Sequence, residues 1–296
     1  MSSINKMQMY AEGNSVYEQD LINSSHYSQA VSFLRDFFLS KGFLETPTQS
    51  RISILAACED PTTVQTYNFL GNVWPLPQTG QMWLEYELLK NPNVKGFFCI
   101  STSYREEKNP IIGRHKVIFP MFEFETHGTL EDLKQLEKEL INHLGLNTDN
   151  KSIKEISYTE AMKFYNVKEI SSVEENKMVN DFAKNVLLTD FPVYTSPFWN
   201  MKLHEDGLRA KKVDVIIEGQ ETIGSAERSA NKEEMREMFY SISNGGYANL
   251  LFTKFGKERV EKELEDFLSF DFFPRFGGGI GVTRLISALL KNGIIK

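Results

Sequence analysis

The chain has 296 residues, the length of one large domain or two small ones. Its 40 acidic residues outnumber 33 basic ones, and the net charge of −7 excludes nucleic-acid binding through bulk positive charge, but not a local basic pocket for phosphates. Two cysteines, Cys58 and Cys99, are too few for a disulfide framework or a four-cysteine zinc site. No apolar run is long enough to span a membrane, so we expect a cytoplasmic protein.

The first half of the chain predicts a helix followed by two paired strands. After a polar N-terminal arm over residues 1–25, apolar residues recur at helical spacing over His26–Ser40. A short extended segment is predicted at Phe43–Pro47. Phe97–Tyr104 and Val117–Glu125 are rich in β-branched and aromatic residues, and the turn signals between them favour an antiparallel hairpin.

The second half predicts mainly helices. Apolar and capping patterns predict them over Thr129–Leu144, Val173–Val186, Asn231–Ile242 and Val282–Leu290. A short strand is predicted over Val213–Ile217. Because helices and strands are intermixed without regular βαβ repeats, the predicted fold class is α+β, with one antiparallel sheet flanked by helices in a single domain over residues 26–296.

The polar connection between the two predicted strands carries several cations. Arg105 ends the first strand, and Arg114 and His115 come just before the second, so a hairpin brings them to one place. Guanidinium groups bind phosphate oxygens bidentately, and Phe119 offers a flat face on which a base could stack. The alternative is an ordinary charged loop at the surface.

Asp214 and Glu221 stand seven residues apart across a turn. Such spacing can place both carboxylates at the same end of a strand pair. Hard oxygen ligands beside substrate phosphates suit Mg²⁺, which proteins usually hold with one or two carboxylates. The alternative is a pair of exposed acids at strand ends.

A run of glycines, Gly277-Gly278-Gly279-Ile280-Gly281, precedes the last predicted helix, and Arg284 follows in its first turn. The run allows a ligand or a strand to approach the backbone closely. An arginine among apolar residues needs a partner, which a phosphate would supply. The run lacks the Lys-Ser or Lys-Thr ending of a P-loop, and the alternative is a glycine-rich turn whose arginine pairs with a carboxylate.

Together these segments resemble the catalytic core of the class II aminoacyl-tRNA synthetases, specifically the aspartyl/asparaginyl branch. Gly42–Pro47 resembles the first motif of that family, which lies at the dimer interface, so the resemblance implies a homodimer. Gly277–Arg284 resembles the third motif. The residues that resemble the second motif are Tyr104–Glu107, Arg114, His115 and Phe119.

The resemblance implies ATP and Mg²⁺ as cofactors and gives roles to single residues. Arg105 and Arg284 would be the catalytic residues, because their charge would stabilise the phosphates. The ATP-binding residues would be Arg105, Glu107, Arg114, His115, Phe119, Glu221, Gly281 and Arg284. The residues that contact the amino acid would be Glu59, Gln81, Glu85, Glu123, Asn200 and Arg228. Asp214 and Glu221 would hold the metal.

The activity implied by the resemblance is adenylation of an amino acid. Only 25 residues precede the first predicted helix, so we expect no anticodon-binding barrel, and at a net charge of −7 we expect no tRNA partner. Two relatives without the barrel are the ammonia-dependent asparagine synthetase and the archaeal asparagine synthetase related to asparaginyl-tRNA synthetase. His115–Glu125 and Gly277–Gly281 resemble the former, which makes asparagine synthesis from aspartate, ATP and ammonia the leading hypothesis.

One departure supports a second hypothesis. Leu84 stands where the aspartyl branch has a lysine, and Glu85 follows the asparaginyl pattern. A glutamate beside the side-chain pocket would repel a carboxylate and favour an amide or an amine. The chain would then adenylate asparagine or a related amino acid and transfer it to an acceptor other than tRNA. A third hypothesis is a regulatory or tRNA-binding relative without activity, which predicts a broken site.

Overall fold

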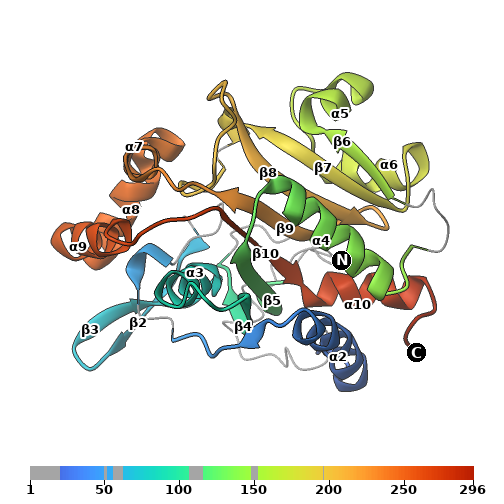
Figure 1. Cartoon of the computed structure of the whole chain (residues 1–296), viewed down its shortest axis with the longest axis horizontal. Coiled ribbons are helices and arrows are strands. Elements are labelled where there is room, and N and C mark those ends of the chain that lie inside the picture. Colours follow the sequence, from blue (N-terminus) through green and yellow to red (C-terminus); the bar gives the residue numbers. More distant parts are fainter. Residues whose placement is uncertain (1–20, 50–51, 56–62, 107–115, 148–152, 196) are drawn as a thin grey trace, which may run out of the picture.

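The computed structural model of the chain describes residues 21–49, 52–55, 63–106, 116–147, 153–195 and 197–296. Within these residues an eight-stranded sheet is antiparallel except at its two edges, where β1 pairs with β4 and β6 pairs with β7 in parallel (Figure 1). In sheet order the strands are β1 (Leu44–Glu45), β4 (Gly96–Tyr104), β5 (Ile118–His127), β10 (Arg275–Gly281), β9 (Gln220–Arg228), β8 (Arg209–Ile217), β7 (Asn185–Pro192) and β6 (Ile153–Ser157). A separate hairpin consists of β2 (Thr66–Phe69) and β3 (Asn72–Pro75).

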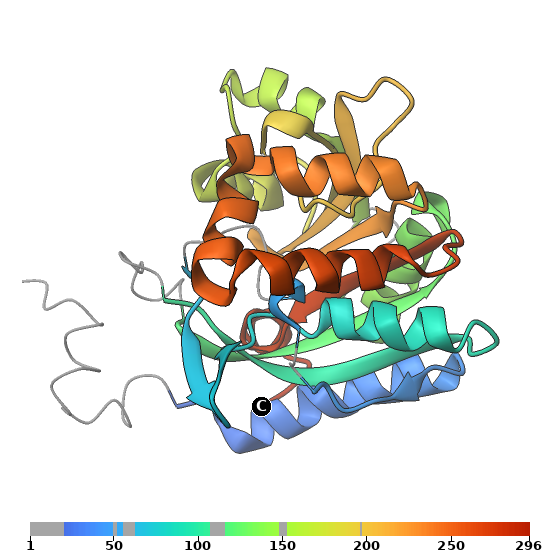
Figure 2. The same ribbon diagram turned by 90° about the vertical axis from the view of Figure 1, so that its left-hand side faces the viewer.

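Helices cover both faces of this sheet. The helices on one face are α2 (Ser24–Ser40), α4 (Leu130–His143) and α10 (Val282–Lys291). The helices on the other face are α3 (Gln81–Lys90), α7 (Lys232–Ser241), α8 (Gly246–Phe255) and α9 (Lys257–Leu268). Figure 2 shows α3 in teal above β4 and β5 and α2 in blue below them, with α7–α9 in orange nearer the viewer. Beside β6 and β7 lie α5 (Tyr158–Tyr165) and α6 (Ser172–Asp181).

Three short 3₁₀ turns complete the regular structure of the described ranges, at Ser53–Leu55, Val193–Thr195 and Ile242–Gly245. No helix in these ranges is long and apolar enough to cross a membrane. The α+β fold class with a mostly antiparallel sheet flanked by helices is therefore confirmed.

Strand alternation separates the main core from the opposite face of the sheet. On β5, Phe122 and Phe124 pack against Phe38 of α2, with ring centroids 5.1 and 5.0 Å apart. Glu123 and Glu125 alternate with them and so project from the other face. The same alternation on β10 places Phe276 and Ile280 in the apolar core, with Gly278 on their face, and turns Gly277 and Gly279 towards α3.

Most predicted elements are confirmed to within a few residues. α2 begins at Ser24, two residues before the expected start, because the Asn23 side chain accepts hydrogen bonds from Ser25 N and His26 N. α4 carries the expected capping box between Thr129 and Asp132. β4 and β5 form the expected hairpin. Residues 1–20 of the predicted arm lie outside the described residues.

One predicted helix is wrong in its second half. α6 ends at Asp181, and Asn185 begins β7, which is buried between β6 and β8. The run from Val186 to Leu188 is short, apolar and fully buried, and periodicity alone does not separate such a strand from a helix. β10 was not predicted as a strand, because glycine is normally depleted from strands.

We predict that Gly277→Ala destabilises the protein by about 3 kcal/mol, because a Cβ there would lie 1.7 Å from Glu125 Oε2 and 2.5 Å from the Phe124 carbonyl oxygen. The backbone oxygen cannot move without disturbing the β5–β10 pairing. Urea unfolding measures the change. Gly246→Ala is the control, since its nearest neighbour is Ser243 at 3.7 Å and it opens α8. Equal stability of the two variants would contradict the prediction.

Candidate active site

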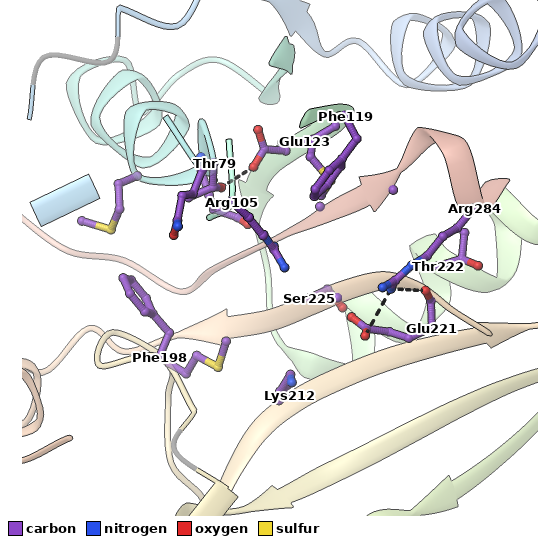
Figure 3. Close-up of a pocket in the computed structure, with 18 of the residues that line it drawn as sticks. Thr79, Arg105, Phe119, Glu123, Phe198, Lys212, Glu221, Thr222, Ser225 and Arg284 are labelled. Carbon is purple, nitrogen blue, oxygen red and sulfur yellow. Dashed lines mark hydrogen bonds and ion pairs between the residues drawn. The ribbon is translucent and has the colours of Figure 1, made fainter. Parts of the chain in front are cut away.

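A pocket opens on the α3 face of the sheet, where β5, β10, β9 and β8 run side by side (Figure 3). Its lining includes Gly279 and Gly224, which are register partners on β10 and β9. A Cβ on Gly279 would lie 2.8 Å from the Met121 side chain, so glycine keeps the space above the strands open. The glycine run is therefore a strand and not a turn, and its residues Gly279 and Gly281 line the pocket.

The pocket concentrates positive charge. Among the described residues that line it, five are cationic: Arg105, Lys116, Lys212, Arg228 and Arg284. They come from separate segments, from the end of β4 to the first turn of α10. Three acidic residues, Glu85, Glu123 and Glu221, line the pocket as well. In a protein with a net charge of −7, the pocket still has more cations than anions, which suits phosphate or carboxylate groups.

Arg105 and Phe119 lie against each other at one end of the β4–β5 hairpin. The guanidinium carbon of Arg105 is 5.4 Å from the centroid of the Phe119 ring, a cation–π contact. Arg105 N donates a hydrogen bond to Val117 O at 2.8 Å, which holds the arginine beside the returning strand. The residues predicted to bind phosphate and to stack on a base are therefore adjacent.

Arg284 is paired with Glu221 across the pocket edge (Figure 3). Its Nη1 donates to the Glu221 backbone oxygen at 2.6 Å and lies 3.4 Å from Glu221 Oε2. Gly281 is the last residue of β10 and precedes the first turn of α10, so Arg284 lies next to the glycines that line the pocket. Both side chains keep about a third of their surface exposed, at 32% and 34%. A carboxylate partner for Arg284 is thus present inside the pocket itself.

Asp214 and Glu221 face each other across a glycine. Asp214 is the register partner of Gly224, and a Cβ on Gly224 would lie 3.3 Å from Glu221 Oε1 and 3.6 Å from Asp214 Oδ1. The missing side chain leaves a cradle between two hard oxygen donors, which fits Mg²⁺. In the part of the chain that is described, no group of three or more His, Cys, Asp or Glu forms a candidate metal site, so substrate oxygens and water would complete the coordination.

Buried charges form the other end of the pocket. Glu85 of α3 is fully buried, and its Oε2 accepts hydrogen bonds from Arg275 Nη2 at 2.8 Å and Nε at 3.1 Å. Its Oε1 accepts from Asn200 Nδ2 at 2.6 Å and lies 3.6 Å from Arg228 Nε. The charge of Glu85 is therefore compensated, which weakens the expectation that it repels a carboxylate substrate.

Arg228 has a second carboxylate partner on β5. Its Nε and Nη2 both lie 3.3 Å from Glu125, and Gln81 Nε2 donates to Glu125 Oε2 at 3.2 Å. Burial raises the pKa of Glu125 to about 7, with Arg228 opposing the shift and Glu85 adding to it. Gln81, Glu85, Asn200 and Arg228, predicted together from the sequence, are thus linked in one network.

Glu123 also lines the pocket, but its oxygens already have donors. Ser101 Oγ donates at 2.6 Å, Gly80 N donates at 2.7 Å, and the Thr79 hydroxyl donates as well. Burial raises the pKa of Glu123 despite these bonds. The observed contacts fix the segment that leads into α3, and its expected contact with an amino acid stays a prediction.

Four predicted site residues lie outside the described residues: Glu59, Glu107, Arg114 and His115. The site also contains charges that sequence reasoning missed, namely Lys212, Glu125 and Arg275. Period-two alternation would have found the first two, because Lys212 precedes Asp214 by two residues and Glu125 follows Glu123 by two. Arg275 gives no such signal, because the glycine run that follows it is not typical of a strand.

Beneath the pocket floor lies a buried carboxylic acid. Glu137 of α4 is 1% exposed, and its Oε1 is 2.6 Å from Ser225 Oγ on β9. The same hydroxyl lies 3.0 Å from Val213 O, and one hydrogen cannot serve both acceptors. A protonated Glu137 resolves this by donating to Ser225, and burial indeed raises the pKa of Glu137 to about 8.

Comparison with known proteins gives one consistent picture. The family model described as tRNA synthetases class II (D, K and N) matches residues 14–296. The chain is 25% identical over 288 residues to an asparagine–tRNA ligase of Desulforamulus reducens, covering 87% of this chain and 63% of that protein. It is 23% identical over 294 residues to an aspartate–tRNA(Asp/Asn) ligase of Methanococcus maripaludis, covering 91% and 64%.

Solved structures share the fold. Asparaginyl-tRNA synthetase from Pyrococcus horikoshii complexed with asparaginyl-adenylate superposes with a TM-score of 0.73 at 20% identity, covering 90% of this chain and 64% of that one. An asparaginyl-tRNA synthetase from Entamoeba histolytica gives the same TM-score of 0.73 at 19% identity. The chain spans less than two thirds of the length of the curated relatives, at 63% and 64%.

We predict that Glu137→Gln removes a pH dependence of stability. Because the folded pKa of Glu137 is raised from 4.5 to about 8, its stabilising contribution is complete below pH 4.5 and is lost as the pH rises through 8. Between pH 5.5 and 8.5 the unfolding free energy of the unaltered protein should fall by roughly 3 kcal/mol relative to Glu137→Gln. Urea unfolding at both pH values measures this. Glu131→Gln, on the exposed side of α4, is the control. If the unfolding free energies of Glu137→Gln and the unaltered protein change equally with pH, Glu137 is not protonated in the folded protein.

Proposed function

The chain belongs to the class II tRNA synthetases (D, K and N), and from this premise we propose that it activates an amino acid with ATP to form an aminoacyl-adenylate and pyrophosphate. The observation that carries the proposal is the convergence of Arg105, Glu221 and Arg284 on one pocket. These residues come from three distant segments, and the resemblance in sequence assigns them to the same ATP site. An inactive relative would not need all three together.

The proposed reaction relies on positioning and electrostatics. A carboxylate oxygen of the amino acid attacks the α-phosphorus of ATP, and the bond to the pyrophosphate oxygen breaks. Arg105 would neutralise charge that grows on the α-phosphate, and Arg284 would hold the outer phosphates. Phe119, next to Arg105, would stack on the adenine. Glycines at the pocket floor let the substrates approach the sheet closely.

Asp214 and Glu221 would hold Mg²⁺ in the cradle over Gly224. When bound there, Mg²⁺ would act as a Lewis acid on phosphate oxygens. The chain's own cations, Arg284 above all, would keep the phosphates bent towards these carboxylates. The amino acid would lie towards Gln81 and Arg228, at the opposite end of the pocket.

The finer proposal is that aspartate is the substrate and ammonia the acceptor. Ammonia nitrogen would attack the acyl carbon of aspartyl-adenylate, AMP would leave, and one proton would be lost from nitrogen to give the amide. Two segments similar to ammonia-dependent asparagine synthetase support this, and their described parts pair directly as β5 and β10. The compensation of Glu85 by Arg275 also removes one objection to an acidic substrate.

The alternative is adenylation of asparagine with transfer to an acceptor other than tRNA. Its support is a network in which Glu85 contacts Asn200 and Arg228. In this network the two acids Glu85 and Glu125 are paired with the two arginines Arg228 and Arg275, so no arginine of the network needs a substrate carboxylate as its partner. A neutral amide would fit such a pocket. The relatives named above are tRNA ligases of asparagine and aspartate, so tRNA is also tested as an acceptor.

We predict amino-acid-dependent ATP–pyrophosphate exchange, driven by aspartate or asparagine out of the twenty amino acids. Arg105→Ala should lower the exchange rate at least about 100-fold, because one lost electrostatic contact to the reacting phosphate has that effect. Radioactive pyrophosphate incorporation into ATP measures the rate. Arg236→Ala, an exposed arginine of α7 paired with Glu265, is the matched control.

The acceptor is identified in a second step. Asparagine and AMP formed from aspartate only when ammonium is present would support the ammonia proposal. Exchange with asparagine, without any ammonium-dependent product, would favour the alternative, and aminoacylation of added tRNA would overturn both acceptor assignments. No exchange with any amino acid would contradict the proposed activity itself.

A further inference from the structure

Lys212 is a pocket cation to which the proposed reaction gives no role. It stands on β8 two residues before Asp214, so both side chains project from the pocket face of the strand. Its Nζ lies 3.2 Å from Asp214 Oδ2 and 4.2 Å from the centroid of the Phe191 ring. Lys212 is only 6% exposed yet lines the pocket, where Figure 3 shows it on the β8 side.

A second cation–carboxylate pair lies on the other side of Gly224. Arg284 Nη1 is 3.4 Å from Glu221 Oε2, and Arg284 lines the same pocket. Each of the two carboxylates proposed to hold Mg²⁺ therefore has its own cationic partner. Among the described residues, two cations, Lys212 and Arg284, thus contact the two carboxylates of the cradle.

This balance has a consequence for the metal. A divalent cation that enters the cradle alone competes with two cations that already neutralise its ligands. Displacing them would separate the buried Lys212 from the Asp214 carboxylate, which costs free energy. A polyphosphate changes the situation, because its oxygens can accept both cations while the metal takes the carboxylates. Metal and nucleotide then bind favourably only together, which is a coupling between two ligands.

We propose that Lys212, with Arg284, makes divalent-metal binding at Asp214 and Glu221 conditional on the nucleotide. The two cations hold the carboxylates in the nucleotide-free pocket and transfer to phosphate oxygens when a nucleoside triphosphate enters. Lys212 is thereby a positioning residue of the proposed ATP site, and the inference rests on that proposed function. The alternative is that Lys212 is only a structural counter-ion of Asp214.

The two ligands are measured separately. Mn²⁺ binding without nucleotide is followed by the loss of the free-ion electron paramagnetic resonance signal, and ATP binding in EDTA is followed by calorimetry. Lys212→Met should bind Mn²⁺ about 10-fold more tightly, equivalent to ~1.4 kcal/mol, because the competing charge is gone. It should bind metal-free ATP about 10-fold more weakly, because a phosphate partner is lost. Opposite shifts distinguish this role from general loss of structure, which weakens both.

Matched variants complete the test. Lys211→Met lies on the same strand with its side chain on the opposite face, paired with Glu227 at 3.3 Å, and should leave both affinities unchanged. Adding Asp214→Asn to Lys212→Met should abolish the gained Mn²⁺ affinity. If Lys212→Met does not fold, Lys212→Gln keeps a hydrogen-bond donor without the charge and is measured in the same way.

Unchanged or weaker Mn²⁺ binding by the Lys212 variant would overturn the inference. Neither binding measurement requires turnover, so this outcome is separate from a failure of the exchange assay. Exchange activity with unchanged Mn²⁺ affinity refutes only the role of Lys212. Opposite shifts in a protein without exchange activity support that role and contradict the adenylation proposal.

Discussion

The alternation of side chains along β5, β10 and β9 is the constraint on which the rest of the structure depends. One face of these strands carries Phe122, Phe124 and Ile280 into the core beneath α2, α4 and α10. The opposite face carries glycines and charges and forms the pocket floor. Because the period is two, a register shift of one residue would exchange the faces, burying charge in the core and filling the pocket with aromatic rings. Core and candidate site are therefore specified by the same pairing.

The buried charges follow from this arrangement. A face that is open for polar substrates also places carboxylates under the helices that cover it, and each needs a partner there. Arg275 lies across from Arg228 in the β10–β9 register, and the two arginines share Glu85. Glu125 is the other partner of Arg228. These pairs join α3, β5, β9 and β10, so the end of the pocket assigned to the amino acid is rigidly cross-linked.

The sequence was most informative where local chemistry and periodicity agree. The capping box of α4, the β4–β5 hairpin and the grouping of Arg105 with Phe119 follow from short-range signals, and the structure confirms them. β10 escaped prediction because its glycines are selected for close approach in the middle of the sheet, which is a long-range property. Arg275 escaped with it. Lys212 escaped because the predicted strand starts at Val213, whereas β8 starts four residues earlier at Arg209, so the period-two alternation from Asp214 was not extended back to it.

The position of β10 also bears on how the chain acquires its structure. It is the last strand of the described sheet in chain order, yet it lies between β5 and β9 and is the strand that connects them. Until it is synthesised, the strands on either side can form only two separate half-sheets with exposed inner edges. Joining them requires contacts across about half of the chain, which slows folding. During translation the half-sheets would be open to pairing with other chains, so the nascent protein is expected to depend on chaperones until its final strand emerges.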